Sequence, residues 1–329
     1  MDVLDARVER ILTAAVRAPS VHNTQPWRVH ATGDTITVRA DTSRWLRHVD
    51  PHRREMFISC GAFVLNARVA ARRESLTARA HVLPDPADPL LVAVLVLQPA
   101  LGPDMDELEL SLAVERRATS REPFDDQPLA ADVLQEIGSA AREEGCVVRL
   151  VQPSDPARDE VLRLLRRAEA LAAEDDVARR EELAWTGTDA TRGDGIPQEL
   201  LGPSRSDDQA AVRYFSRSTG RGSFEHRSTL AVLTTPRDDA ADWIAAGQAT
   251  ERLLLVATTF FVRASFATTV LENPTTRHAL ARALELDGSP QMLLRLGYGT
   301  LLLHTPRRPI EQILLPSDAA TGRTRTGRP

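Results

Sequence analysis

The stretch that decides the fold lies close to the N-terminus and reads Ala18-Pro19-Ser20-Val21-His22-Asn23-Thr24-Gln25-Pro26-Trp27. A proline fixes its own backbone and removes a hydrogen-bond donor, so two flanking prolines predict a rigid loop. Within the loop stand short hydroxyl and amide side chains, which can hydrogen-bond the polar edge of a planar ring that the chain passes closely. We therefore expect this stretch to form one wall of a ligand site.

A second stretch, a third of the way along the chain, supplies positive charge and reads Arg116-Arg117-Ala118-Thr119-Ser120-Arg121-Glu122-Pro123-Phe124. Arg117, Thr119 and Arg121 stand at alternate positions, which places them on one side of an extended segment. Such a row suits a phosphate. An arginine-rich segment by itself is more often a solvated face, so the prediction depends on the two stretches together.

The composition excludes several classes of protein. The chain has 329 residues, 42% of them apolar, which is enough for one large domain or two. The net charge of −5 comes from mixed charges, so neither a basic face for nucleic acid nor an acidic tail is implied. All 41 basic residues are arginine, which excludes a Schiff-base lysine and the lysine of a P-loop. No G-x-G-x-x-G occurs, so a separate Rossmann domain is not expected.

Other patterns bear on location and metals. The longest apolar run, 90–97, is far shorter than a bilayer span, and the acidic N-terminus lacks a signal-peptide core, so we expect a cytoplasmic protein. Cys60 and Cys146 have no partner spacing for zinc or a redox pair and are expected to be buried thiols. His48 and His52 stand four apart, but the proline between them argues against a helix, and no metal site is expected.

A weak internal repeat predicts two related halves, 1–100 and 101–329. The helical stretch 11–15 is echoed by 137–141, and Phe57-Ile58-Ser59-Cys60-Gly61 is echoed by Trp243-Ile244-Ala245-Ala246-Gly247. A glycine inside a helix costs ~1 kcal/mol relative to alanine, so its repetition predicts a close approach of two helices. Only the first half has the proline-bounded loop and only the second has the arginine segment. One complete ligand site is therefore expected.

The stretch of about 168–228 departs from this repeat. It begins with a charged helix expected over 168–183 and continues as a segment rich in Gly, Ser, Asp and Arg. Irregular segments longer than about 15 residues are usually functional lids or disorder. Trp185, Ile196 and Phe215 offer more apolar anchoring than a free linker needs, which favours a lid. The tail 317–329 has no large apolar residue and is expected to be mobile.

Over most of its length the chain resembles the nitroreductase superfamily, and most closely its single-chain branch, the Acg family of FMN-binding proteins. The resemblance rests on the segments already quoted together with 50–55 running into 58–61, Ala246-Gly247-Gln248-Ala249-Thr250-Glu251-Arg252, and 294–299. It implies an α+β fold, with a mixed sheet flanked by helices, in which an ordinary homodimer has become two pseudo-symmetric halves of one chain.

The resemblance also implies residue roles at the phosphate end of FMN and beside its ring. Arg117, Thr119 and Arg307 are expected to hold the phosphate, since charge-assisted contacts are the strong ones. Arg121 is expected near the flavin N1 and C2 carbonyl, where a fixed cation stabilises the negative charge that develops on reduction.

Further roles concern the ring itself. Ser20 and Asn23 are expected to reach the ring or the ribityl chain, and backbone N–H groups around Ala267 and Thr268 are expected to face N5. Members of the superfamily generally protonate substrates from solvent, so no acid or base is assigned, and His22 is interpreted as a hydrogen-bonding spacer.

Three functions remain open at this point. The first is an NAD(P)H-dependent FMN oxidoreductase that transfers hydride by a ping-pong cycle to a nitro, quinone-like or other electron-poor acceptor. The second is a flavin-holding protein with a closed lid and little or no turnover. The third is a flavin-modifying or deiodinating relative. The expected partners are small molecules, without nucleic acid or membrane. A monomer suffices for one site, and further self-association, the acceptor and the choice between NADH and NADPH stay open.

Overall fold

The computed structural model describes residues 4–102, 104–205, 213, 215–300 and 303–316, so the expected mobile tail lies outside the described residues. The helices are α1 (Ala6–Ala15), α2 (Arg54–Arg73), α3 (Met105–Arg116), α4 (Ala131–Ala140), α5 (Arg158–Glu174), α6 (Asp176–Leu183), α7 (Ala240–Thr259), α8 (Thr269–Glu272), α9 (Pro274–Ala283) and α10 (Ile310–Ile313). The longer strands are β1 (Trp27–Thr32), β2 (Thr35–Ala40), β3 (Leu76–Val82), β4 (Leu91–Pro99), β5 (Val147–Val151), β10 (Thr229–Thr235), β11 (Arg263–Phe266) and β12 (Ser289–Gly297). Short strands are β6 (Thr186–Thr188), β7 (Ile196–Pro197), β8 (Ser204–Arg205) and β9 (Arg221–Gly222).

The longer strands form two four-stranded sheets, with the orders β1-β2-β4-β3 and β11-β12-β10-β5. The α+β class is confirmed, but the expected mixed sheet is instead two sheets whose strand pairs are antiparallel. Parallel strand pairs among the described residues are the short β6-β7 and β8-β9. Antiparallel neighbours need only a short return of the chain, as at Gly33 between β1 and β2, where φ is +58°. The four strands of each sheet therefore come from one part of the chain, 27–99 for the first sheet and 147–297 for the second.

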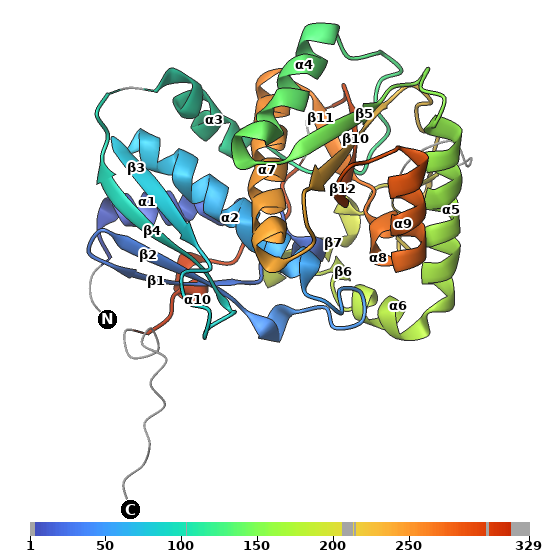
Figure 1. Ribbon diagram of the computed structural model, residues 1–329. Helices are drawn as coiled ribbons and strands as arrows, with labels where there is room; N and C mark the ends of the chain where they lie inside the picture. Colours follow the sequence, from blue (N-terminus) through green and yellow to red (C-terminus); the bar gives the residue numbers. More distant parts are fainter. Residues whose placement is uncertain (1–3, 103, 206–212, 214, 301–302, 317–329) are drawn as a thin grey trace, which may run out of the picture.

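Two long helices, α2 and α7, lie between the sheets, as Figure 1 shows. A Cβ atom at Gly61 would lie 2.2 Å from the Ile244 carbonyl oxygen, and one at Gly247 would lie 2.0 Å from that of Ile58. Only glycine permits this distance between the two backbones, so the close helix approach expected from the repeat is confirmed. Residues of both helices also line the cavity described below.

The first sheet packs on α1 and α2 through a core that includes Trp27 and Phe63, both without exposed surface. The last described segment returns to this sheet, where the Leu315 N–H donates to the Val29 carbonyl at 2.7 Å. Residues from the end of the chain thus complete the packing of its beginning. The division into halves at residue 100 stays a prediction.

The single charged helix expected over 168–183 is wrong. Residues of this stretch belong to α5 and α6, which are separated at Asp175. The Asp175 carboxylate accepts hydrogen bonds from the N–H groups of Val177 and Ala178, both at 3.0 Å. An aspartate that satisfies the free N–H groups at a helix start favours a new helix there, and this local capping outweighs the continuous helical pattern.

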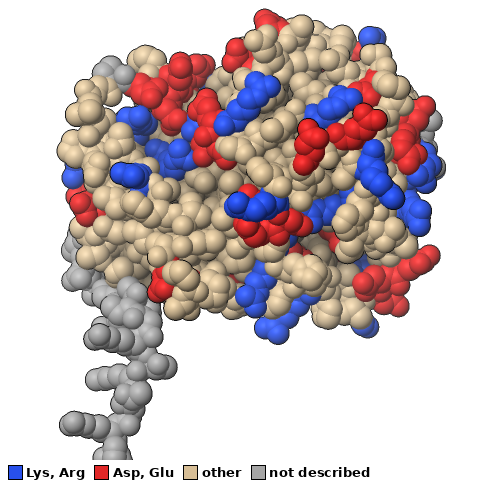
Figure 2. Space-filling model, in the orientation of Figure 1, with Lys and Arg blue, Asp and Glu red and all other residues tan. Residues whose placement is uncertain are grey.

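Charged side chains of both signs alternate over the face drawn in Figure 2, without a field of one sign. In the described part of the chain, no helix has both the length and the apolar character that crossing a membrane requires.

Candidate functional site

The proline-bounded loop adopts an unusual backbone. His22, Asn23 and Gln25 have φ values of 45°, 56° and 51°, in the left-handed region that residues with a Cβ seldom occupy. Such conformations cost free energy and persist where surrounding contacts determine them. The loop is therefore held by its neighbours.

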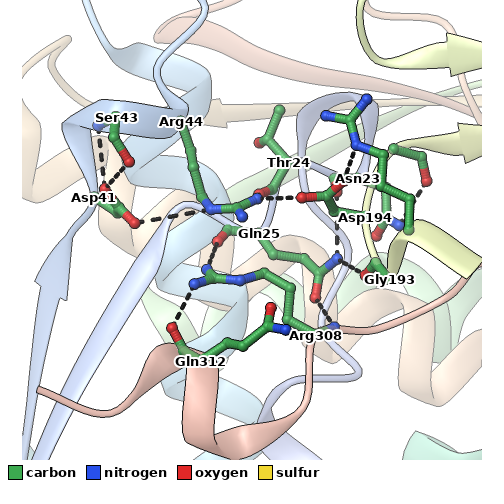
Figure 3. A network of polar contacts seen from close by, with 12 residues as sticks. Asn23, Thr24, Gln25, Asp41, Ser43, Arg44, Gly193, Asp194, Arg308 and Gln312 are labelled. Carbon is green, nitrogen blue, oxygen red and sulfur yellow. Dashed lines mark hydrogen bonds and ion pairs between the residues drawn. The ribbon is translucent and has the colours of Figure 1, made fainter. Parts of the chain in front are cut away.

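Those neighbours are two segments from much later in the chain, drawn in Figure 3. The Gln25 side chain donates to the Gly193 carbonyl at 2.9 Å and accepts from the Arg308 N–H at 2.8 Å. Arg44 forms an ion pair with Asp194 at 2.7 Å. The expected lid and the C-terminal segment thus fix the loop from two sides.

Beside this loop lies a cavity whose empty volume is roughly 930 Å³ when the open space at its mouth is included. Its lining combines residues from the loop, from α2 and α7, from the arginine segment, from β11 and β12, and from the expected lid. The lining residues are Pro19, Ser20, Val21, His22, Asn23, Glu55, Ile58, Ser59, Ala62, Thr119, Arg121, Ile196, Arg213, Phe215, Thr250, Ser265, Phe266, Thr268, Met292, Thr305 and Arg307.

Most of the expected site residues meet in this cavity. Six line it, namely Ser20, Asn23, Thr119, Arg121, Thr268 and Arg307. Arg117 and Ala267 do not belong to the lining. The two stretches that the sequence singled out are therefore joined in one site, and two of the eight expected residues lie behind it.

Arg117 is held behind the cavity wall by Glu251 of α7. Its Nε lies 3.2 Å from a Glu251 carboxylate oxygen, and a guanidinium N–H donates to the Arg17 carbonyl. Glu251 has no exposed surface, and the Asn66 side chain is a further polar neighbour. Burial raises the pKa of Glu251 to about 7, although Arg117 lowers it. Sequence reasoning quoted Glu251 only within the segment 246–252 and assigned it no role.

Arg307 lies at the same end of the cavity. Its Nη1 donates to Asn23 Oδ1 at 3.1 Å and to Thr305 Oγ1 at 2.6 Å, while its buried Nε has no partner in the described structure. Burial, together with the nearby charges of Arg117, Arg17 and Arg121 and against that of Glu251, lowers the pKa of Arg307 to about 9. Several arginines thus converge where one carboxylate faces them, which leaves an excess of positive charge.

Arg121 is the cation with the least compensation. Its one hydrogen bond to the described residues is a long contact of 3.3 Å with the Leu200 carbonyl, and none of them forms an ion pair with it. Its guanidinium carbon lies 5.9 Å from the centre of the Phe215 ring. Burial, followed by repulsion from Arg213, lowers the pKa of Arg121 to about 10. A half-buried cation of this kind attracts an electron-rich or anionic ligand.

Two expected ligand contacts are already used within the protein. The Ala267 N–H donates to the Leu293 carbonyl at 2.9 Å as part of the sheet edge, so its expected role toward a ligand is wrong. The Asn23 amide donates to the carbonyls of Gly195 and Pro306 at 2.8 and 3.0 Å. Asn23 therefore fixes the loop as well as lining the cavity, which Thr268 also lines.

The expected lid contributes Ile196, Phe215 and Arg213 to the lining. Arg213 forms ion pairs with Glu182, at 2.8 Å, and with Glu272, which connect this segment to α6 and α8. Burial and the charge of Arg213 lower the pKa of His22 well below its ordinary value. His22 is therefore neutral and suited to hydrogen bonding, not to acid catalysis at neutral pH.

Comparisons with known proteins agree with this architecture. A Mycobacterium tuberculosis protein named "Putative NAD(P)H nitroreductase" is 30% identical over 317 residues, covering 93% of this chain and 90% of its own length. A second from the same organism, "Putative NAD(P)H nitroreductase acg", is 30% identical over 321 residues, covering 95% of each chain. The crystal structure of a nitroreductase-named protein from Anabaena variabilis matches 91% of this chain and 90% of its own with a TM-score of 0.55 at 11% identity, a likeness of fold. No protein-family model matches the chain.

Proposed function

Because the chain belongs to the family of nitroreductase-like proteins that includes Acg of Mycobacterium tuberculosis, we propose that it binds FMN in the cavity and acts as an NAD(P)H-dependent oxidoreductase. The acceptor would be a nitro, quinone-like or other electron-poor compound. Nicotinamide and acceptor would bind in turn at the same face of the ring, in a ping-pong cycle. The relatives' printed names and the residues of this chain support the proposal separately.

The phosphate end of FMN fits the arginine-rich end of the cavity. Arg307 and Thr119 line it, and buried polar atoms without a partner in the described structure, Arg307 Nε and Thr250 Oγ1, are available there. A phosphate offers several acceptor oxygens and negative charge, and so complements a site that has hydrogen-bond donors and positive charge. Arg117 would act from behind, through its charge and by its pairing with Glu251.

The ring end of FMN fits the remaining lining, and Arg121 is the observation that carries the proposal. Apolar surface from Ile58, Phe215 and Met292 suits a planar aromatic system. Arg121 supplies a half-buried positive charge without a counter-ion among the described residues. Such a charge suits a ring that becomes electron-rich on reduction.

Bound FMN would supply the two-electron chemistry, accepting hydride from NAD(P)H and passing it on. The residues of the chain bind, orient and exclude water. Arg121 would stabilise the negative charge beside the ring, Ser20 and Thr268 would contact its polar edge, and Phe215 would limit the entry of water. These roles are electrostatic and positional, since the hydride chemistry belongs to the cofactor.

Two measurements test the proposal. The protein is titrated with FMN, with riboflavin in parallel, and we expect FMN to bind more tightly because only FMN carries a phosphate. The loaded protein is then mixed with NADH or NADPH in a stopped-flow spectrometer, and we expect rapid bleaching with at least one of them. A protein that stays colourless after soaking in FMN would refute the proposal.

A flavin-holding protein is the second candidate, and the position of Ile196 and Phe215 favours it. Both lid residues line the cavity that the nicotinamide would have to enter. A permanently closed lid would prevent reduction by NADH and NADPH while leaving the flavin reducible by dithionite. Full flavin occupancy with this pattern would identify the protein as a flavin holder.

A further inference from the structure

Glu55, in the first turn of α2, separates two hollows of the molecule. It lines the inner cavity next to Ile58 and Ser59. It also lines an outer groove of roughly 1410 Å³ of empty volume, bounded by the N-terminal end of α2 and by α8 and α9. The residues of the groove that can carry charge are Asp50, His52, Arg54, Asp238, Glu272, Arg277 and His278. The Glu55 side chain thus lies between the proposed flavin site and the outer groove.

The Glu55 carboxyl is held at one oxygen. Arg54 donates to Glu55 Oε1 at 3.0 Å and turns its other nitrogen to the Gln291 carbonyl at 2.5 Å. No hydrogen bond from the described residues is made to Oε2. Glu55 is 6% exposed, so this second oxygen is available to carry a proton within a wall that is nearly closed to water.

The surroundings of Glu55 favour its neutral form. Burial raises the pKa of Glu55 to about 8, and the carboxylates of Glu272 on α8 and Asp50 before α2 act in the same direction. Arg54 on α2 and Arg213 from the lid segment act against it. Asp50, nearer the outer groove, has a pKa raised to about 6 by burial. The raised pKa lets Glu55 carry a proton near neutral pH against the opposing charge of Arg54, which lies 3.0 Å away, and Asp50 is a second carboxyl that lines the outer groove.

The proposed reaction needs a proton inside the cavity. A hydride adds two electrons and one proton to an acceptor, so a quinone Q becomes the neutral hydroquinone by Q + H⁻ + H⁺ → QH₂. The hydride originates from NAD(P)H and arrives through the flavin, but the extra proton must come from elsewhere. Phe215 and Ile196 place apolar surface in the cavity lining, and His22, whose pKa is lowered, does not supply this proton.

We propose that Glu55 is the proton relay of this site, giving its proton to the acceptor bound in the cavity and regaining one from water in the outer groove. In each turnover one O–H bond of Glu55 breaks, the acceptor gains that proton, and the carboxylate left behind is reprotonated from the groove side. This inference rests on the proposed function, because the proton is needed only when an acceptor is reduced.

The experiment separates the two half-reactions with FMN-loaded protein. Reduction by NAD(P)H delivers a hydride and needs no proton from Glu55, whereas reoxidation by a quinone does. General acids contribute about 10²–10⁴-fold to rates, so we expect Glu55→Gln to slow reoxidation at least tenfold and reduction less than twofold. Glu55→Asp, which keeps a carboxyl group, should retain more of the reoxidation rate than Glu55→Gln.

A second readout needs no cofactor. The infrared spectrum of the flavin-free protein at neutral pH should contain the carbonyl band of a protonated carboxylic acid that Glu55→Gln removes and that shifts in heavy water. Asp238→Asn is the matched control, because Asp238 lines the outer groove but not the cavity. We expect this control to preserve the band and both half-reactions.

The outcomes distinguish the two levels of inference. If Glu55→Gln changes both half-reactions equally or neither, or if the infrared band is absent from the parent, the relay is refuted while the oxidoreductase stands. If the parent binds FMN but neither nicotinamide reduces it, the proposed function fails first and the relay with it. Thermal melting of each flavin-free variant identifies misfolding. If Glu55→Gln is misfolded, Glu55→Asp takes its place, and the change in its reoxidation rate is compared with the change in its reduction rate.

Discussion

Replacing Arg121 with methionine should weaken FMN binding and stabilise the empty protein. Arg121 is half-buried at the cavity and, apart from one long contact with the Leu200 carbonyl, has no hydrogen-bond or ion-pair partner among the described residues. A hydrogen bond to a charged group contributes about 1.5–3 kcal/mol, and 1.4 kcal/mol is a factor of ten. We therefore expect Arg121→Met to raise the Kd for FMN about 10- to 100-fold.

The same change removes a half-buried charge that the Leu200 carbonyl and the Phe215 ring offset in part. Full burial of an ion costs several kcal/mol, so for this half-buried one Arg121→Met should raise the free energy of unfolding of the flavin-free protein by about 1 kcal/mol. Fluorescence titration with FMN and chemical denaturation without it measure the two effects. Their opposite signs distinguish a ligand-binding arginine from a structural one.

Arg295 provides the matched control. It is a fully buried arginine outside the cavity lining, and its Nη1 lies 2.7 and 2.8 Å from the two carboxylate oxygens of Glu225. Arg295→Met strands that buried carboxylate and should cost about 3–5 kcal/mol of stability. The reasoning is refuted if Arg121→Met keeps the Kd for FMN within threefold, or destabilises the empty protein as Arg295→Met does.

Three further predictions concern the core around the site. Gly247→Ala should lower the free energy of unfolding by about 3 kcal/mol, measured by denaturant titration, because its Cβ would lie 2.0 Å from the Ile58 carbonyl oxygen; a neutral effect would contradict the tight helix contact. Burial raises the pKa of Glu251 from 4.5 to about 7, so the unfolded chain loses its proton first as pH rises. The parent should therefore lose about 1.4 kcal/mol of stability per pH unit across that interval relative to Glu251→Gln, and parallel stability curves would exclude the shift. Burial also raises the pKa of Cys60 above its usual range, so a thiol reagent should label this cysteine only after denaturation, and rapid labelling of the native protein would show that it is accessible.

Local patterns carried much of the fold prediction. The strands expected near 27–30, 90–97 and 147–151 are present, and the paired glycines of α2 and α7 meet as the repeat predicts. These features depend on residues close together in the chain, or on a glycine whose cost inside a helix demands a reason. The break at Asp175 was equally local but was overlooked, since a capping aspartate can be recognised from its position before a helical run.

The sequence predicted most of the residues that line the site, but it did not predict which partners those residues pair with. Thr119, Arg121 and Arg307 line one cavity, as the motif and the family resemblance imply. Arg117 belongs to the same motif, yet its guanidinium is occupied by Glu251, which lies on a helix far along the chain. The lid segment could be recognised as an insertion, whereas its contact with the cavity through Phe215 required the structure.

The sequence by itself determined the family, the secondary-structure pattern, and the two stretches that meet in the cavity, because residue type and spacing act over short distances along the chain. Only the tertiary structure decided which of those groups remain available to a ligand. It leaves Arg121 without a counter-ion among the described residues, occupies the Ala267 amide, and sets Glu55 between the cavity and the outer groove. The free energy of a buried charge or hydrogen-bonding group depends on every group packed around it, and those groups come together only when the chain has folded.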